Sequence, residues 1–266
     1  RLIADVHNQN GIIVLPENIN VMTPYINSKH PSDSPLHDDH LVIGSFPGMD
    51  SHFMYFFEPQ TRNVAYYGKQ LLMPIGEYSV SWVRFLIELS HDAKWLALYD
   101  KTTANQPARG KGAALYTDST IKGLILAGSI CAENISPYIY RDETKLGATV
   151  LINIASLSPF RNSQTLSRQT IAIDTTRALE NGRYFIVSSN DNRSFVIRDT
   201  GDIEHMTDGR EVNSFFNATV QTKTYMTPYV LFGDYILYLA FTTLLVAALW
   251  LLDWGAGNAK KVSSTR

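Results

Sequence analysis

The only cysteine of the chain, Cys131, lies where a nucleophile would be expected. It ends an apolar run over residues 124–130, and Glu133 follows two positions later. A strand that ends at a thiol, with a helix beginning directly after it, exposes the sulfur in a crevice and directs backbone N–H groups toward it, which favours the thiolate. The same pattern is compatible with a small buried apolar side chain, so other residues must decide between these interpretations.

Two further segments add a carboxylate and a cation. Residues 12–15 form a short apolar run typical of a buried strand, and Glu17 follows it after a proline, so we expect Glu17 to face the same crevice as Cys131. Lys69 and Glu77 bracket a Pro/Gly turn. Acyl transfer through a thiol needs a base, donors for a tetrahedral oxyanion, and an acid for each leaving group. Glu17, Lys69 and Cys131 supply these groups.

The order of these three residues resembles that of the nitrilase, or carbon-nitrogen hydrolase, superfamily. The surrounding sequence is similar, more narrowly, to the apolipoprotein N-acyltransferase family, the membrane branch of that superfamily. The similar segments are Tyr67-x-Lys69-x-x-Leu72-x-Pro74-x-Gly76-Glu77-Tyr78, Cys131-x-Glu133 with Pro137, Arg177-Ala178-Leu179-Glu180-x-Gly182-Arg183, and Thr227-Pro228-Tyr229-x-x-x-Gly233-Asp234. Together they make the resemblance extend from about residue 12 to about residue 252.

The resemblance implies an α/β fold, the four-layer αββα sandwich of nitrilases, followed by one C-terminal transmembrane helix. It implies Cys131 as nucleophile, Glu17 as general acid/base and Lys69 as oxyanion stabiliser, with Glu77 and Glu133 as supporting carboxylates that orient Lys69 or the cysteine loop. No cofactor is implied. The implied reaction moves a fatty acyl group from a phospholipid to the thiol as a thioester. The acyl group then passes to the α-amino group of the diacylglyceryl-modified N-terminal cysteine of an apolipoprotein.

Two segments depart from the family pattern. Ala132 stands where the family usually has an aromatic residue after the nucleophile, and residues 153–160 lack the expected Asn-Asp-x-Trp-Phe sequence. Because the three catalytic positions are unaffected, we expect altered substrate fit rather than a different reaction class.

The C-terminal region contains a predicted membrane span. Residues 235–252 carry no charge, and a helix of that length covers roughly 27 Å, close to the thickness of the hydrocarbon core. Interfacial aromatic anchors stand at both ends, and basic residues follow: Tyr235, Tyr238, Trp250 and Trp254, then Lys260, Lys261 and Arg266. This pattern predicts a cytoplasmic tail and an extracytoplasmic catalytic domain, and the resemblance implies that the membrane is the bacterial cytoplasmic (inner) membrane. The alternative is a buried core helix.

These features predict a catalytic domain over residues 1–228, a transmembrane helix over 229–254 and a basic tail over 255–266. The chain opens with Arg and reaches Glu17 without the strand and helix that precede this glutamate in the family. Only a remnant of that helix fits within residues 1–10. We therefore expect a fragment or truncated member whose domain is incomplete at the N-terminus.

Composition excludes several classes of protein. The 266 residues are 45% hydrophobic and 18% charged, enough for one sizeable core, and the net charge of −2 gives no electrostatic basis for binding nucleic acid. A single cysteine excludes an intramolecular disulfide framework and a cysteine-cluster zinc site. The seven histidines, including His30, His37, His40 and His52, lack metal-ligand spacing, so we expect no metal.

The alternation of apolar and polar residues, and the turn residues between the apolar runs, predict the remaining helices and strands. We expect strands over 41–46, 52–58, 63–69, 149–154, 184–188, 194–198 and 215–222, and two more within 115–131. Helices are expected over 82–98 and 163–181, and solvated loops over 24–40 and 100–112.

Two other functions remain open from the residues alone. A membrane-tethered amidase or nitrilase would use the same three side chains but pass the acyl group to water, which an assay with a small amide would detect. A catalytically silent interaction domain would instead hold Cys131 as an inert buried thiol, which a thiol-reactive probe would reveal across a range of pH.

Overall fold

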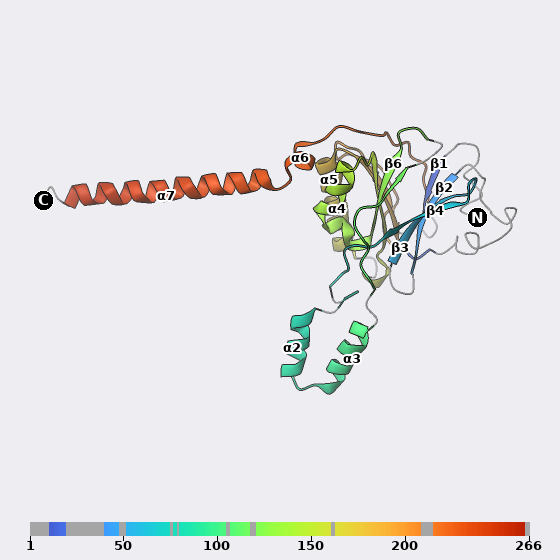
Figure 1. The fold of residues 1–266 in the computed structure, drawn as a ribbon, viewed down its shortest axis with the longest axis horizontal. Helices are drawn as coiled ribbons and strands as arrows, with labels where there is room; N and C mark the ends of the chain where they lie inside the picture. The colour runs from blue at the N-terminus through green and yellow to red at the C-terminus, as the bar shows by residue number, and fades with distance from the viewer. Residues whose placement is uncertain are drawn as a thin grey trace.

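Two β-sheets packed face to face form the centre of the molecule, and helices cover the outer face of one of them (Figure 1). The computed structural model describes residues 11–19, 40–47, 52–74, 77–78, 80–104, 107–117, 121–160, 163–208 and 215–263. The remnant helix predicted over 1–10, most of the 24–40 loop, His30, His37 and Arg266 lie outside these residues.

The first sheet carries the segments that lead to Glu17 and Lys69. Its strands, in spatial order, are β1 (Gly11–Val14), β2 (His40–Pro47), β3 (His52–Glu58) and β4 (Asn63–Gly68). β1 is parallel to β2, whereas β2, β3 and β4 form an antiparallel meander. The strands predicted in this region are confirmed.

The second sheet carries Cys131 at the end of its parallel centre. The central strands β6, β7 and β8 run parallel, so their carboxyl ends lie at one edge, while the outer strands pair antiparallel. In spatial order the strands are β10 (Ile203–Met206), β9 (Phe195–Ile197), β8 (Tyr184–Asn190), β7 (Val150–Ser156), β6 (Ile125–Ile130) and β5 (Leu115–Thr117).

Alternating residues of the second sheet build two cores. One set faces the first sheet and is fully buried there, including Leu126, Ile130, Ile152 and Ile154. The other set faces helices α4 (Pro137–Lys145) and α5 (Gln164–Asn181), including Ala127, Leu151 and Phe185. Because side chains alternate along a strand, a single strand serves both cores. No helix among the described residues covers the outer face of the first sheet, so the described part of the predicted αββα sandwich has three of its four layers.

At Gly128 the second sheet lies directly against side chains of the first. A Cβ at this position would overlap the Met54 sulfur and lie 3.2 Å from the Phe56 ring, so a larger residue here would displace the Met54 side chain. Phe56 in turn stacks on Tyr116 with ring centroids 5.0 Å apart.

A helical hairpin projects from the sandwich between the lysine and cysteine segments (Figure 1). The single helix predicted over 82–98 is wrong: α2 (Ser81–Leu89) ends, and α3 (Ala93–Ala104) begins after three intervening residues. His91 between them has a φ of 54°. The Asp92 carboxylate accepts from Lys94 N at 2.9 Å and so begins the second helix. Part of the loop predicted over 100–112 is therefore helical.

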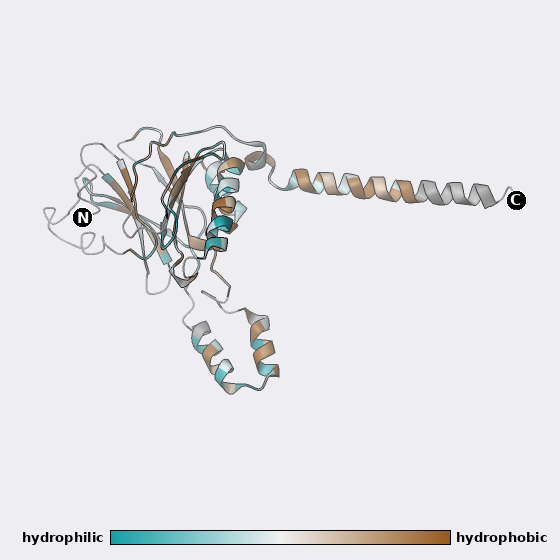
Figure 2. Ribbon diagram, turned by 180° about the vertical axis from the view of Figure 1, so that it is seen from behind, coloured by the Kyte–Doolittle hydropathy of each residue, from teal (hydrophilic) through white to brown (hydrophobic). Residues whose placement is uncertain are grey.

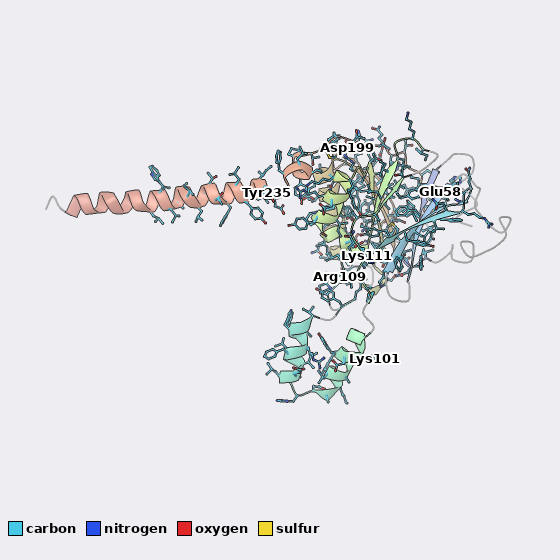
Figure 3. The ribbon with its side chains drawn as sticks, in the orientation of Figure 1. Glu58, Lys101, Arg109, Lys111, Asp199 and Tyr235 are labelled. Carbon is cyan, nitrogen blue, oxygen red and sulfur yellow. The ribbon has the colours of Figure 1, made fainter. Side chains whose placement is uncertain are left out.

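Large apolar side chains of this hairpin face solvent, and Figure 2 shows the apolar residues on both helices. The exposed set is Trp82, Phe85, Leu86, Leu89, Trp95 and Leu98. Arg109 and Lys111 lie where the chain returns from the hairpin to the sandwich, whereas Lys101 lies on the hairpin itself (Figure 3).

The strand predicted over 215–222 is wrong. These residues form no ladder; they are mostly exposed and run extended over the surface. Among the described residues the last strand is instead β10, which pairs with β9 and has a register irregularity between Ile203 and His205. The extended segment is held at its end by Arg183, whose guanidinium donates to the Tyr225 carbonyl at 2.6 Å.

The C-terminal helix α7 (Tyr235–Ser263) extends away from the sandwich, and Figures 1 and 2 show its length and apolar surface. Its segment Tyr235–Leu252 has a mean hydropathy of 2.1 and is 0% buried, so it is long and apolar enough to cross a membrane. Among the described residues nothing buries this segment, unlike the core helix that was the alternative. The preceding α6 (Pro228–Phe232) is attached to α4 because Arg141 Nε donates to the Tyr229 and Val230 carbonyls, each at 3.1 Å.

The close approach at Gly128 predicts a specific packing cost. Gly128→Ala should lower the free energy of unfolding by about 1–3 kcal/mol, because the new methyl group displaces the Met54 side chain. Urea unfolding in detergent micelles measures the change. In Met54→Ala/Gly128→Ala the methyl group occupies vacated space, so the double variant should be more stable than the sum of the single changes requires. Strict additivity would contradict this account.

Candidate active site

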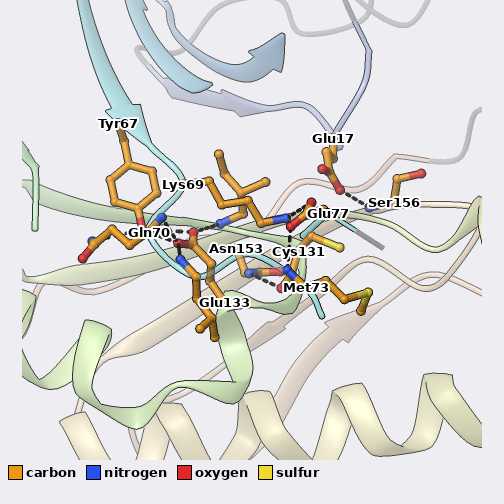
Figure 4. Close-up of polar contacts among 12 residues, drawn as sticks. Glu17, Tyr67, Lys69, Gln70, Met73, Glu77, Cys131, Glu133, Asn153 and Ser156 are labelled. Atoms are coloured by element: carbon orange, nitrogen blue, oxygen red, sulfur yellow. Dashed lines mark hydrogen bonds and ion pairs between the residues drawn. The ribbon is translucent and has the colours of Figure 1, made fainter. Parts of the chain in front are cut away.

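The structure brings Glu17, Lys69 and Cys131 together between the ends of the two sheets (Figure 4). Glu17 and Lys69 are buried and Cys131 is half-buried. Glu17 and Cys131 lie close enough for each to act on the pKa of the other, and both lie close enough to Lys69 for its charge to act on their pKa values. The three residues come from three separate strand ends, and their catalytic roles remain predictions.

Glu17 is positioned by the turn that follows β1. The strand continues its pairing through Leu15 N, which donates to the Ile43 carbonyl at 2.8 Å, and Asn18 then turns the chain with a φ of 64°. The carboxylate accepts from Ser156 N at 2.9 Å. Burial raises the pKa of Glu17, and the charge of Lys69 limits the rise.

Lys69 is held by a second carboxylate. Its Nζ lies 2.5 Å from Glu77 Oε1, and the other oxygen of Glu77 accepts from Met73 N at 2.8 Å. Glu77 is thus itself oriented by the backbone of the turn, in agreement with its predicted position beside the lysine. Burial alone would lower the pKa of Lys69, but the nearby Cys131, Glu77 and Glu17 raise it above its ordinary value. Lys69 is therefore a cation at neutral pH.

Cys131 lies in a strained turn at the end of β6. Its φ is 55°, a left-handed conformation that costs a non-glycine residue about 1–2 kcal/mol. The helix expected directly after it is wrong in detail: a 3-10 turn, η2 (Cys131–Ile135), comes first, and α4 begins only at Pro137.

The thiolate expected from the sequence is also wrong for the resting site. Burial and the negative charge of Glu17 raise the pKa of Cys131 to about 12, against the opposing effect of Lys69. The thiol is therefore neutral at rest. A carboxylate with a raised pKa accepts a proton more readily than a solvated carboxylate does. Glu17 is therefore suited to take the thiol proton as the sulfur forms a new bond.

Glu133 joins the lysine segment to the nucleophile segment. Its fully buried carboxylate accepts from Gln70 N at 2.5 Å and Leu71 N at 3.0 Å on one side, and from Ile130 N at 2.7 Å on the other. The Tyr67 hydroxyl also donates to it at 3.0 Å (Figure 4). Burial raises the pKa of Glu133, while the backbone N–H groups favour the ionised form.

Sequence reasoning missed several polar groups around the nucleophile. Ser156 N, the Tyr67 hydroxyl and the Asn153 amide all belong to this network. Ser156 and Asn153 lie on β7. This strand runs parallel to β6, so its carboxyl end lies beside the end of β6 that carries Cys131. In the part of the chain that the structure describes, no group of three or more His, Cys, Asp or Glu side chains is arranged to hold a metal ion.

Curated proteins that are similar in sequence to this chain are apolipoprotein N-acyltransferases. The chain is 28% identical over 200 residues to an apolipoprotein N-acyltransferase of Chromobacterium violaceum, covering 71% of this chain and 34% of the relative. It is also 28% identical over 189 residues to one from Bordetella bronchiseptica, covering 68% and 32%. The chain thus spans about a third of the length of these curated relatives. No protein-family model matches it.

A solved structure extends the comparison to the fold. Nit3 of Saccharomyces cerevisiae, a member of branch 10 of the nitrilase superfamily, superposes with a TM-score of 0.52 at 13% identity, covering 74% of this chain and 72% of that one. The predicted resemblance and nitrilase-like fold are confirmed.

The Glu133 network predicts coupled stability effects. Glu133→Gln should lower the free energy of unfolding by about 2–3 kcal/mol, because an amide cannot accept from every donor that now surrounds the carboxylate. Tyr67→Phe removes one of those donors and should cost about 1 kcal/mol. Since the two residues share a bond, the double variant should cost less than the sum. Urea unfolding of the two single variants and the double variant gives the double-mutant cycle. Additive losses of stability would show that the hydrogen bond from Tyr67 to Glu133 contributes nothing.

The pKa shifts predict the pH profile of thiol alkylation. Below the raised pKa of Glu17 the carboxyl is neutral and cannot take the thiol proton, so iodoacetamide should react slowly. The rate should rise at a pH above the ordinary 4.5 of a glutamate, and again toward about 12 as the thiol itself ionises. Glu17→Gln should remove the first rise and move the second to lower pH, because a negative neighbour is lost. Identical profiles would contradict the coupling. Mass spectrometry of the single cysteine measures both.

Proposed function

We propose that this chain is the catalytic part of a bacterial membrane acyltransferase, of the kind named apolipoprotein N-acyltransferase among its relatives. The observation that carries the proposal is the joining of a thiol, a carboxyl with a raised pKa and a buried ammonium group at three strand ends. These are the base, cation and nucleophile that acyl transfer through a thioester requires.

In the first proposed step a phospholipid ester carbonyl approaches Cys131. The sulfur forms a bond to the carbonyl carbon while the thiol proton passes to Glu17. Lys69 stabilises the negative oxygen of the tetrahedral intermediate. Collapse of this intermediate breaks the ester C–O bond, and the departing alkoxide of the lysophospholipid takes the proton from Glu17. The enzyme is left with a neutral thioester and an ionised Glu17.

In the second proposed step an amine attacks the thioester carbonyl. Glu17 accepts a proton from the amine, Lys69 again stabilises the oxyanion, and the C–S bond breaks to leave an amide. The proton on Glu17 returns to the sulfur, which restores the neutral thiol of the resting site. The acceptor that we propose is the diacylglyceryl-modified N-terminal cysteine of an apolipoprotein.

Two apolar surfaces support a membrane location for this chemistry. α7 presents an uncharged span to its surroundings, and the α2–α3 hairpin exposes aromatic and aliphatic side chains beside the sandwich. A lipid donor and a lipid-modified acceptor both reside in a bilayer, so an enzyme attached to that bilayer meets both. We place the catalytic domain on the extracytoplasmic side of the bacterial cytoplasmic membrane, because the basic residues follow the span.

The proposal predicts a covalent intermediate. Incubation of the chain with phospholipid micelles and no acceptor should add a fatty acyl mass to Cys131 that hydroxylamine releases, because a thioester is labile to that nucleophile. Cys131→Ser should lose the hydroxylamine-labile adduct. Glu17→Gln and Lys69→Met should each slow loading by on the order of 10² or more, since each removes a group that the transition state needs.

The matched control is Lys111→Met, which removes an exposed lysine outside the cluster and should load at the normal rate. Addition of a lipid-modified peptide amine should then discharge the thioester to an amide. Discharge to water alone would indicate an amidase instead, and unchanged loading in Cys131→Ala would refute covalent catalysis.

A further inference from the structure

Asn153 lies directly behind the nucleophile turn, in the neighbouring strand β7. It is fully buried and stands opposite Ser129 in the parallel register of β6 and β7. Its amide nitrogen donates to Ser129 Oγ at 2.8 Å and to the Cys131 carbonyl at 3.2 Å (Figure 4). A carbonyl can only accept, so the amide must present its nitrogen to Cys131.

The other end of this amide suggests why asparagine is present. Asn153 Oδ1 is buried and has no hydrogen-bond partner among the described residues. An unpaired buried oxygen is unfavourable, whereas an apolar side chain of similar shape would avoid that cost. The useful part of the side chain is therefore its donor, and the donor faces the backbone of the nucleophile.

The hydrogen bond from Asn153 to the Cys131 carbonyl fixes the peptide plane between Cys131 and Ala132, which lies in a strained turn. Cys131 has a positive φ, and two side chains hold the backbone on either side of it. Glu133 accepts from Ile130 N before the cysteine, and Asn153 donates to the carbonyl after it. Because a trans peptide is planar with its C=O and N–H antiparallel, holding the Cys131 carbonyl also fixes the direction of the Ala132 N–H.

The direction of the Ala132 N–H follows from which face of the second sheet each neighbouring side chain occupies. Asn153 and Ser129 lie on the helix-facing side of the sheet, since the alternate residues Ile130, Ile152 and Ile154 face the first sheet. The Cys131 carbonyl points toward Asn153, so the Ala132 N–H points to the opposite side, where the Cys131 side chain packs. Ala132 lies in the first turn of η2, where N–H groups have no intrahelical partner.

We propose that Asn153 is a positioning residue for acyl transfer: it holds the Cys131 carbonyl so that the Ala132 N–H serves, beside Lys69, as a second donor to the oxyanion. This inference rests on the proposed function, because it needs a tetrahedral intermediate on Cys131. Asn153 itself touches no reacting atom.

The test separates oxyanion formation from thiol reactivity. Acylation of Cys131 by a p-nitrophenyl ester passes through an oxyanion, whereas alkylation by iodoacetamide does not. Asn153→Leu keeps the approximate shape but removes the donor. Its acylation rate should fall roughly tenfold to hundredfold, a decrease no greater than that caused by removing an oxyanion donor altogether. Its alkylation rate at the same pH should change by less than about threefold.

Asn181→Leu is the matched control. Asn181 is equally buried, and its amide nitrogen donates to the Arg177 carbonyl at 2.9 Å, within helix α5. This variant should lose stability without changing the ratio of acylation to alkylation. If Asn153→Leu lowers both rates together, or neither, the positioning role is overturned. If the unaltered chain is alkylated but never acylated by the ester, the proposed function fails and this inference fails with it.

Discussion

The site depends on one buried carboxylate that joins two distant segments of the chain. Glu133 accepts backbone N–H groups from the lysine segment and from the strand that delivers the nucleophile. This carboxylate therefore links the segment of Lys69 directly to the strand end that carries Cys131. A buried ion surrounded by directed donors is a rigid connection, because any displacement leaves a charge or a donor unpaired at high cost.

The same low-polarity environment sets the chemistry. Burial raises the pKa of both Glu17 and Cys131, so at rest the proton stays on sulfur and the carboxyl is ready to accept it. The cation of Lys69 opposes both shifts, and Glu77 keeps that cation in place. In the proposed reaction the thiol is therefore neutral at rest and loses its proton to Glu17 as it attacks.

Local patterns predicted the central strands well and the periphery poorly. β2, β3, β7, β8 and helix α5 carry strong alternation, turn residues or a capping serine, and the structure has them where they were predicted. The helix expected over 82–98 breaks because Asp92 competes for backbone N–H groups, a local effect that apolar periodicity hides. The strand expected over 215–222 has suitable residues but forms no ladder, although Phe216 stacks on His205 of the edge strand β10, because pairing is a property of the whole sheet.

By itself the sequence determined the order of the three chemical groups, the strands that end at them and an apolar segment long enough to cross a membrane, because each is a matter of residue type and spacing. Only the tertiary structure decided how the groups interact. The neutral state of Cys131 depends on burial and on Glu17, which is remote in sequence, and the donors to Glu133 and the Asn153 contact depend on the pairing of strands far apart in the chain. Desolvation and directed hydrogen bonds act over a few ångströms, so they exist only once the fold has brought these segments together.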